Sequence, residues 1–502
     1  MLSIFDQGRP HPCPPDFNLS AYVLRMAQDF PTKTALEIVS ASDHQHMDYA
    51  TLEQRVRAVG TGLLETGLQP GDIVLLRLGN TIDFPIAFLG AIAAGLVPVP
   101  TSSQLTKREV ASIIATLSPR AVLHDPSVST APHARTIDRN TLRAMWELPA
   151  CVYDLGDPDR LAYVVYTSGT SGQARPVAHA HRAIWARKMM IRDWYGLSSQ
   201  DRLMHAGAFN WTFTLGTGLM DPWSMGATAV IPDADVSHDQ LPTLLEQNDV
   251  TIFAAVPGVY RKILKHSDAL SFPNLRHCLS AGEKLSPTIR TKWQTATQTQ
   301  IYEAFGMSEC STFISHGPGR TAAPDSLGRP QSGRRIAILN DAGPVPLGDT
   351  GVIAVHASDP GLMKGYIGAP DETRARFQGE WFLTGDHGRM TEDGSIFYDG
   401  RHDDMMNAGG FRVSPIEVEQ ALGRCPGLTQ IAVTAVSPKP DVEIIAAFYV
   451  ASPELDPETL SQFAETCLAE YKRPKTYQRM DALPTNPNGK LNRRALRNSF
   501  EG

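Results

Sequence analysis

The sequence predicts an α/β protein with a large N-terminal domain of stacked α/β sheets, a β-rich subdomain, and a small α+β domain at the C-terminus. Three observations indicate this division. Short apolar runs alternate with helical apolar repeats in the first part of the chain, glycine and proline become frequent from about residue 325, and the last stretch again mixes both patterns. Alternating helices and strands are typical of a sheet with helices packed on its faces.

The first elements are recognised by their apolar period and their end signals. Thr51 and Gln54 have the spacing of a capping box, and the apolar residues that follow repeat at helical intervals until Gly67. A second helix is predicted to end at Gly95. Short apolar runs predict buried strands at residues 73–76, 97–100, 121–123 and 163–166.

The later part of the chain has the texture of a β-rich subdomain followed by a separate domain. Strands are predicted at residues 335–339 and 351–355, with turns between them. A charged, glycine-containing run at 399–404 then precedes a final stretch of helix and strand, and we place the domain boundary in this run.

The composition excludes several classes of protein. The chain of 502 residues carries 46 basic and 53 acidic residues, for a net charge of −7, which argues against a nucleic-acid partner held by a basic face. Hydrophobic residues at 42% are enough for a substantial core, which argues against global disorder.

Cysteine spacing and apolar runs bear on the compartment. The six cysteines are far apart and form no C-x-x-C pair, so a disulfide framework or zinc ribbon is not predicted. The first residues lack the pattern of a signal peptide, and the most apolar segment, 84–100, is short for a membrane span and contains glycine and proline. We therefore expect a soluble, cytoplasmic protein with no membrane span.

The segment at 166–175, Y-T-S-G-T-S-G-Q-A-R, is the first candidate for chemistry. Two glycines stand among four hydroxyl residues directly after a predicted strand, and Arg175 adds positive charge. Such a loop can bring backbone N–H groups and hydroxyls close to phosphate oxygens. Its spacing is not that of a Walker P-loop. By itself the segment leaves open a phosphate cradle and an ordinary polar turn.

Other segments along the chain favour the phosphate interpretation. Glu309 follows a glycine-containing turn and is suited to a hydrated divalent cation. Asp386 lies in a glycine turn where a carboxylate could accept from ribose hydroxyls, and Lys490 stands alone near the end of the chain. Each of them alone would be read as a solvated surface charge.

Together and in this order, the segments resemble the adenylate-forming superfamily of acyl-CoA synthetases, peptide-synthetase adenylation domains and luciferases. The resemblance extends from about residue 20 to residue 500. Its matching segments are 167–172, 280–284, 305–309, 328–330, 363–366, 381–386, 400–419, 471–474 and 484–494. In this superfamily a carboxylate attacks the α-phosphorus of ATP, and a thiol then displaces AMP. The cofactors that the resemblance implies are ATP, Mg²⁺ and coenzyme A.

The resemblance implies roles for individual residues in adenylation. Glu309 would ligate Mg²⁺, and Lys490 would contact the carboxylate and the α-phosphate. Lys490, Glu309 and Arg401 are the expected catalytic residues. The expected ATP-binding residues are Thr167, Ser168, Gly169, Thr170, Ser171, Gly172, Gly282, Glu283, Phe305, Ser308, Asp386 and Arg401.

The resemblance also implies a mobile C-terminal lid. Residues 1–399 would form the N-terminal domain, 400–404 the hinge and 405–502 the lid, which would rotate about Asp403 before the thioester forms. The expected coenzyme A-binding residues are Gly409, Gly410 and Arg412.

Two positions depart from the usual pattern. Arg175 stands where the phosphate loop usually has lysine, which keeps the charge but not the geometry. Asn407 stands where many relatives have lysine, and asparagine here resembles acetyl- and other acyl-CoA synthetases. The second departure favours a coenzyme A ligase.

The acyl pocket is expected to take an acid larger than acetate. Acetyl-specific relatives have tryptophan at the position of Gly306, so we expect a deeper pocket here. Trp211 and Phe213 would form an apolar wall, although packing in the core is an alternative role for Trp211. Asn210 stands where amino-acid-activating relatives have aspartate. The predicted substrate is therefore an aromatic, branched or medium-chain carboxylic acid.

Alternatives remain beside the ATP-dependent carboxylate–CoA ligase. A free-standing adenylation enzyme would load an acyl or amino acid onto a carrier protein. A non-catalytic nucleotide-binding protein is a further alternative, but it would not need all of the charged residues Glu309, Asp386, Arg401 and Lys490 that this chain has. A luciferase-like oxygenase has no sequence support. His179 and His181 lack nearby cysteine or acidic partners, which favours a structural role or a place on the substrate wall over a metal site. A homodimer is one assembly that the sequence leaves open.

Overall fold

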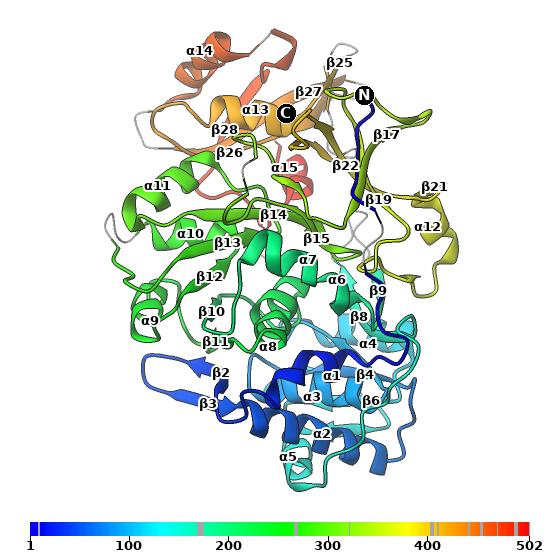
Figure 1. Ribbon diagram of the computed structural model, residues 1–502. Coiled ribbons are helices and arrows are strands. Elements are labelled where there is room, and N and C mark those ends of the chain that lie inside the picture. Colours follow the sequence, from blue (N-terminus) through cyan, green and yellow to red (C-terminus); the bar gives the residue numbers. More distant parts are fainter. Residues whose placement is uncertain are drawn as a thin grey trace. The chain divides into compact units, whose positions relative to one another are not determined.

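Figure 1 shows the computed structural model of the protein. The chain divides into two compact units, which we call the N-terminal unit (Phe5–Ile336 and Val355–Phe382) and the C-terminal unit (Met1–Ile4, Ala337–Ala354 and Leu383–Gly502). The predicted boundary at 400–404 stays a prediction, because most of that run lies outside the described residues. The structure describes residues 1–8, 11–167, 175–265, 270–320, 322–401, 406–408, 411–439, 442–451, 455–468, 470–485 and 490–500.

The centre of the N-terminal unit is a nine-stranded sheet of mixed direction. The strands from β2 to β14 run parallel to their neighbours, while β3, β15 and β16 pair antiparallel at the two edges. Their order across the sheet is β16 (Arg329–Pro330), β15 (Ser311–Ser315), β14 (Ile301–Met307), β13 (His277–Ala281), β12 (Ile252–Ala255), β10 (Arg202–His205), β11 (Thr228–Pro232), β2 (Thr34–Val39) and β3 (His44–Asp48).

Both faces of this sheet are buried, which explains its nearly continuous apolar strands. Phe253 of β12 belongs to a core with α9 (Leu241–Gln247), α10 (Pro257–Ile263) and α11 (Pro287–Thr297). Its neighbours Ile252 and Ala254 belong to a second core with Trp194 and Tyr195 on the opposite face. Alternate residues thus face alternate cores, as the period of a strand requires.

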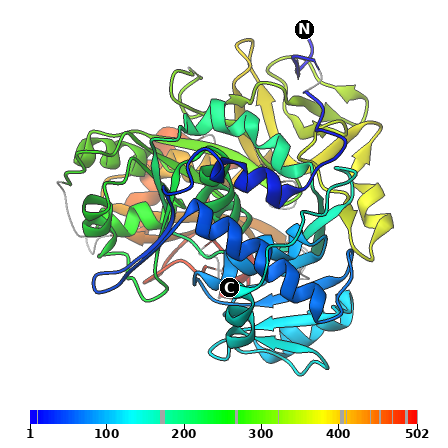
Figure 2. The same ribbon diagram turned by 60° about the horizontal axis from the view of Figure 1, so that its bottom comes forward.

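A four-stranded sheet confirms the strands that the sequence predicts first. Its order is β5 (Val97–Pro100), β4 (Ile73–Arg77), β6 (Ala121–His124) and β7 (Thr136–Asp138). The helices α2 (Tyr49–Glu65) and α3 (Asp83–Ala93) lie side by side in both views (Figures 1 and 2). A Cβ on Gly90 would lie 2.7 Å from the Val56 carbonyl oxygen, so glycine permits this close packing.

The predicted start of α2 is wrong by about one turn. The N-cap is Asp48, whose carboxylate accepts from the Thr51 N–H at 2.8 Å, and Thr51 itself lies inside the helix. A capping residue is followed by the helix and satisfies its first N–H groups, and aspartate does this as well as threonine. The remaining α-helices of this unit are α1 (Leu19–Leu24), α4 (Lys107–Leu117), α5 (Arg139–Ala144), α6 (Ala183–Ala186), α7 (Lys188–Met190), α8 (Asp221–Ser224) and α12 (Pro370–Ala375).

A third sheet of the N-terminal unit flanks the expected phosphate loop. Its order is β20 (Gly365–Tyr366), β9 (Arg175–Ala180) and β8 (Leu161–Thr167). Thr167 pairs with Arg175 across the antiparallel β8–β9 ladder. The segment at 168–174 therefore connects two paired strand ends.

The C-terminal unit has a small three-stranded sheet covered on both faces. The strands β26 (Leu428–Lys439), β27 (Val442–Ala451) and β28 (Thr476–Arg479) are adjacent in that order. The helices α13 (Pro415–Leu422) and α14 (Pro457–Cys467) share a core with Val433 and Ala447, while Ala432 and Phe448 pack with Leu496 of α15 (Arg493–Asn498). A two-stranded sheet joins β24 (Met406–Ala408) to β25 (Phe411–Val413).

The remaining strands form a seven-stranded sheet. Its main order is β1-β17-β19-β22-β21, and β18 and β23 pair with β17 and β22. The predicted strands at 335–339 and 351–355 are confirmed as β17 and β19. The bounds are β1 (Ile4–Asp6), β17 (Arg335–Asn340), β18 (Gly343–Pro344), β19 (Gly351–His356), β21 (Phe377–Gln378), β22 (Trp381–Met390) and β23 (Ile396–Arg401).

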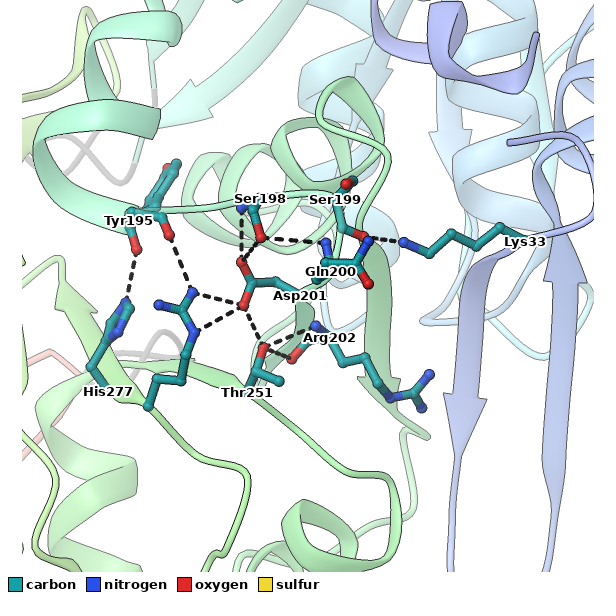
Figure 3. Close-up of polar contacts among 11 residues, drawn as sticks. Lys33, Tyr195, Ser198, Ser199, Gln200, Asp201, Arg202, Thr251 and His277 are labelled. Atoms are coloured by element: carbon teal, nitrogen blue, oxygen red, sulfur yellow. Dashed lines mark hydrogen bonds and ion pairs between the residues drawn. The ribbon is translucent and has the colours of Figure 1, made fainter. Parts of the chain in front are cut away.

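A carboxylate ties together the amino ends of the parallel strands in the nine-stranded sheet. Asp201 accepts hydrogen bonds from the Ser198 N–H at 2.8 Å and Thr251 Oγ1 at 2.8 Å (Figure 3). It also accepts one from Arg276 Nη2 at 2.7 Å. Burial would raise the pKa of Asp201, but the hydrogen bonds from Thr251, Arg276 and Ser198 outweigh it, so the pKa is lowered. These contacts connect the starts of β10, β12 and β13. The carboxyl ends of the same strands are left for ligand binding.

Candidate active site

The candidate site of the N-terminal unit lies where the parallel strands end. Gly207 follows β10, Gly282 follows β13 and Glu309 follows β14. In parallel α/β sheets, ligands bind at the carboxyl ends of the strands. The motifs that the sequence identifies at 282–283 and 305–309 are thus on the edge of the sheet where a ligand is expected.

Glu309 is held by residues of the β20 segment. The Tyr366 hydroxyl donates to Glu309 Oε1 at 2.7 Å, and the Met363 N–H donates to the Glu309 carbonyl oxygen at 2.7 Å. Burial, followed by the charge of Glu309, raises the pKa of Tyr366 to about 12, so the phenol keeps its proton at neutral pH. The other oxygen, Oε2, accepts no hydrogen bond within the described part of the chain.

One carboxylate oxygen of this kind fits a magnesium ion. Mg²⁺ is usually bound through one or two carboxylates together with substrate phosphates, because it dehydrates reluctantly and keeps several waters. Glu309 would supply one such ligand. No group of three or more histidine, cysteine, aspartate or glutamate side chains able to hold a metal by themselves occurs among the described residues.

His179 connects the strand after the phosphate loop to the Glu309 turn. Its Nε2–H donates to the Ser308 carbonyl oxygen at 2.7 Å, and its ring stacks on Tyr163 with centroids 4.9 Å apart. Burial lowers the pKa of His179 to about 4. His181 is also buried, and its Nδ1 accepts from the Leu19 N–H at 3.0 Å. Both rings are therefore buried and hydrogen-bonded to the backbone. Their structural role stays a prediction.

Trp211 lies next to Gly282, one of the expected ATP-binding residues. A Cβ on Gly282 would lie 3.8 Å from the Trp211 ring, and Gly282 itself has φ of 94°, a left-handed conformation that favours glycine. Phe213 packs edge-to-face against both Trp211 and His205, with centroids 6.4 Å and 4.4 Å apart. An apolar aromatic surface therefore adjoins the predicted nucleotide segment.

The segment after Phe213 is held by a buried ion pair that sequence reasoning missed. Residues Thr214–Met220 form a π-helix, a rare conformation that is frequent at functional sites. Arg187 donates to both oxygens of Asp221 at 2.7 and 2.6 Å and also contacts Ser311 Oγ. A Cβ on Gly216 would lie 2.2 Å from Arg187 Nη2, so this glycine makes room for the guanidinium.

Strand pairing explains why residue 306 is a glycine, and the sequence could not show this. A Cβ at this position would lie 2.1 Å from the Ser311 carbonyl oxygen and 2.4 Å from the Thr312 Cα. The register of β14 and β15 shifts between Phe305 and Gly306. The glycine is thus required by strand pairing, and its small size alone is not a measure of pocket depth. Phe305 packs edge-to-face on Phe313, with centroids 5.5 Å apart.

The C-terminal unit carries three more of the predicted residues, Asp386, Arg401 and Lys490. Asp386 is buried on β22, its Oδ1 accepts from the Tyr398 hydroxyl at 3.0 Å, and it lies opposite Arg401 in the β22–β23 register. Lys490 is half-buried, one residue before Leu491, which bridges to Thr485. The register of β22 and β23 thus pairs Asp386 with Arg401. A joint role of the two residues at the ribose stays a prediction.

Several predicted residues cannot be placed. Ser168, Gly169, Thr170, Ser171, Gly172, Asp403, Gly409 and Gly410 lie outside the described residues, as do the side chains of Thr167, Arg401 and Arg412. Asn210 is half-buried beside Trp211, and Glu283 follows Gly282. Roles for all of these residues stay predictions. Among the helices that the structure describes, none has the length and apolar character needed to cross a bilayer.

Comparison with known proteins agrees with the arrangement of the motifs. Residues 23–367 match the family model of the AMP-binding enzyme, and residues 417–490 match that of the AMP-binding enzyme C-terminal domain. The mitochondrial acyl-coenzyme A synthetase ACSM3 of Rattus norvegicus is 28% identical over 466 residues, covering 86% of this chain and 80% of its own.

Solved structures show the same fold over nearly the whole chain. A benzoate CoA ligase from Burkholderia xenovorans LB400 is 27% identical, with a TM-score of 0.85, covering 96% of this chain and 100% of its own. ATP-bound MatB from Rhodopseudomonas palustris is 25% identical, with a TM-score of 0.87, covering 96% and 98%. The chain therefore belongs to the AMP-binding enzyme family of the adenylate-forming superfamily.

Proposed function

We propose that the protein is an AMP-forming acid–thiol ligase that joins a carboxylic acid to coenzyme A in two steps. The first step forms an acyl-adenylate and pyrophosphate from the acid and ATP, and the second forms the acyl-CoA and AMP. The observation that carries the proposal is the position of the Trp211 ring, which would lie 3.8 Å from a Cβ built on Gly282, an expected ATP-binding residue. An apolar surface thus lies beside this residue. Relatives that match over most of the chain include an acyl-coenzyme A synthetase and a benzoate CoA ligase.

The chemistry needs positioning more than a protein nucleophile. The substrate carboxylate itself attacks the α-phosphorus, so the protein must hold the two reactants in line and neutralise phosphate charge. Lys490 would contact the carboxylate and the α-phosphate, and Asp386 with Arg401 would bind the ribose. A Mg²⁺ ion held by Glu309 and the phosphates would supply further neutralisation. Residues 167–172 would donate to the β- and γ-phosphates.

For the thioester step, the C-terminal domain would rotate to a second orientation. Residues 400–404 would act as the hinge, with Asp403 as the pivot, and Gly409, Gly410 and Arg412 would line the path of the pantetheine. The reacting thiol would come from coenzyme A. Four cysteines, at 151, 278, 310 and 425, are buried, while Cys13 is partly exposed and Cys467 is exposed. For Cys278, burial raises the thiol pKa to about 12, which suits a structural role.

The proposed substrate is an aromatic, branched or medium-chain acid. Trp211 and Phe213 offer aromatic faces, and His205 behind Phe213 is neutral because burial lowers its pKa to about 3. Asn210 offers no negative charge to an amino acid's ammonium group. A cytoplasmic location and a homodimer also stay predictions.

A substrate panel tests the proposal. The purified protein is incubated with ATP, Mg²⁺ and coenzyme A and with benzoate, branched acids, hexanoate, octanoate, acetate or amino acids, while pyrophosphate and acyl-CoA are measured separately. We expect both products with aromatic, branched or medium-chain acids. Pyrophosphate without acyl-CoA would favour a carrier-protein acceptor, and activity with acetate or amino acids alone would refute the proposed substrate class.

A further inference from the structure

Tyr366 joins the strand after the expected phosphate loop to the carboxylate of Glu309. It lies on β20, pairs with Val177 of β9, and is buried with 4% of its surface exposed. A phenol has a single proton to donate, and here it goes to Glu309 Oε1 at 2.7 Å. The hydrogen bond fixes one oxygen of Glu309 and leaves the other for a ligand.

The backbone of Tyr366 is itself held in place. Its N–H donates to Thr373 Oγ1 of α12 at 2.9 Å, and the Lys364 N–H donates to the Ala178 carbonyl oxygen of β9 at 2.8 Å. Gly365, with φ of 148°, places its missing Cβ 3.0 Å from Thr373 Cγ2. The phenol therefore reaches Glu309 from a backbone that hydrogen bonds hold to α12 and β9, and a fixed donor of this kind can orient a metal ligand.

The Arg175 guanidinium makes a cation–π contact with the ring of Tyr366. Its guanidinium carbon lies 5.4 Å from the centre of that ring, and its Nε makes an ion pair with Glu372 Oε2 at 2.9 Å. A planar guanidinium can face a ring and pair with a carboxylate at the same time, whereas a lysine ammonium is a point charge without this geometry. The arginine at this position thus has two partners that lysine would not hold equally.

We propose that Tyr366 is a positioning residue that orients Glu309 for the divalent cation accompanying ATP, and that Arg175 holds Tyr366 in this orientation. The inference rests on the proposed function, because it takes Glu309 as a ligand of that cation. It gives Arg175 a role in the nucleotide site through Tyr366 and Glu309. Contacts through Tyr366 then connect Arg175, at the end of the expected phosphate loop, to Glu309, the expected cation ligand.

The test measures cation binding directly. Mn²⁺ is titrated into the full-length protein with α,β-methylene-ATP, which cannot form the adenylate, and free Mn²⁺ is followed by electron paramagnetic resonance. Loss of a partner that orients a metal ligand typically weakens metal binding about 10- to 100-fold. We expect Tyr366→Phe to raise the Mn²⁺ dissociation constant about tenfold and Arg175→Lys to raise it by a smaller factor, about threefold.

Kinetics separate positioning from a general structural effect. In pyrophosphate release, Tyr366→Phe should need about tenfold more Mg²⁺ for half-maximal rate, and its rate at saturating Mg²⁺ should stay within about threefold of wild type. The matched control is Tyr49→Phe, which also removes a buried phenol donor, to the Ala227 carbonyl oxygen at 2.6 Å. It should leave the Mn²⁺ and Mg²⁺ dependence unchanged.

The outcomes distinguish this inference from the proposed function. Wild-type protein that makes acyl-CoA, together with a Tyr366→Phe variant that binds Mn²⁺ like wild type, would overturn the inference alone. An equal shift in Tyr49→Phe would also overturn it, since the effect would then be general. Wild-type protein that releases no pyrophosphate with any acid would refute the proposed function, while the Mn²⁺ titration would still test Tyr366.

Discussion

We expect four buried neutral histidines to make the stability of the N-terminal unit steeply dependent on pH. His179, His181, His205 and His277 are each at most 4% exposed. Burial is the main cause that lowers their pKa values, to about 4 for His179 and His277 and to about 3 for His181 and His205. The hydrogen bonds that His179 and His277 donate to backbone carbonyl oxygens do not offset this loss of hydration.

The sign follows from which state binds the protons. An unfolded histidine has a pKa of about 6.5, so below this pH the unfolded chain takes up protons that the folded chain does not. The histidines' contribution to stability is therefore intact above about pH 6.5 and is lost as the pH falls toward about 4. With about four protons of difference near pH 5, the free energy of unfolding should fall by about 5 kcal/mol per pH unit.

This slope is large compared with the total stability of a domain, which is about 5–15 kcal/mol. Acid unfolding is therefore expected near pH 5, before the carboxylates titrate. Burial would raise the pKa values of Asp193 and Asp201, but hydrogen bonds and nearby arginines lower them instead. Their stabilising contribution is lost only as the pH falls below about 4.

Tryptophan fluorescence reports this transition selectively. The seven tryptophans, at 146, 185, 194, 211, 223, 293 and 381, all belong to the N-terminal unit. Urea unfolding at pH 7, 6, 5.5 and 5 gives the slope, and His277→Gln should reduce it by about one proton, or about 1.4 kcal/mol per pH unit. The exposed His46 provides the control His46→Gln, which should leave the slope unchanged. A wild-type slope of one proton or less would refute the reasoning.

Three further substitutions test the site and the fold. Lys490→Ala should reduce acyl-adenylate formation at least about hundredfold while leaving thioester formation from supplied acyl-adenylate largely intact, and an equal loss of both half-reactions would contradict this division. Asp386→Asn should weaken ATP binding about tenfold by calorimetry, because a charged acceptor for the ribose is lost, and unchanged binding would exclude that role. Asp201→Asn should cost the N-terminal unit about 2–3 kcal/mol in urea unfolding at pH 7, because Arg276 loses its charged partner; a cost below about 0.5 kcal/mol would contradict the importance of this network.

Strand positions could be predicted because their causes are local. Residues 73–76, 97–100 and 121–123 are short apolar runs between turn signals, and they form β4, β5 and β6. The start of α2 was predicted less well, since Asp48 and Thr51 are both good caps and only the path of the chain decides between them. Two capping residues a few positions apart can each start a helix, whereas an apolar run is stable only when it is buried in the core.

The family could also be predicted from the order of the motifs, because binding a cation and phosphates needs particular side chains. A divalent cation and phosphates call for a carboxylate, glycines, hydroxyls and a lysine, and these residue types are visible at 309, 167–172 and 490. Sequence could not show why Gly306 is glycine. The reason is the Ser311 carbonyl oxygen, which a strand register brings to the place of a Cβ.

The sequence by itself determined the kinds of groups available and their local elements, while the tertiary structure decided their partners. Tyr366 meets Glu309 across 57 positions of the chain, His179 meets Ser308 across 129, and Arg187 meets Asp221 across 34. Helical and strand periods relate residues only a few positions apart, so no local pattern encodes such pairs. Buried polar groups need partners because water is excluded, and the packing of the sheets determines which partner each one finds.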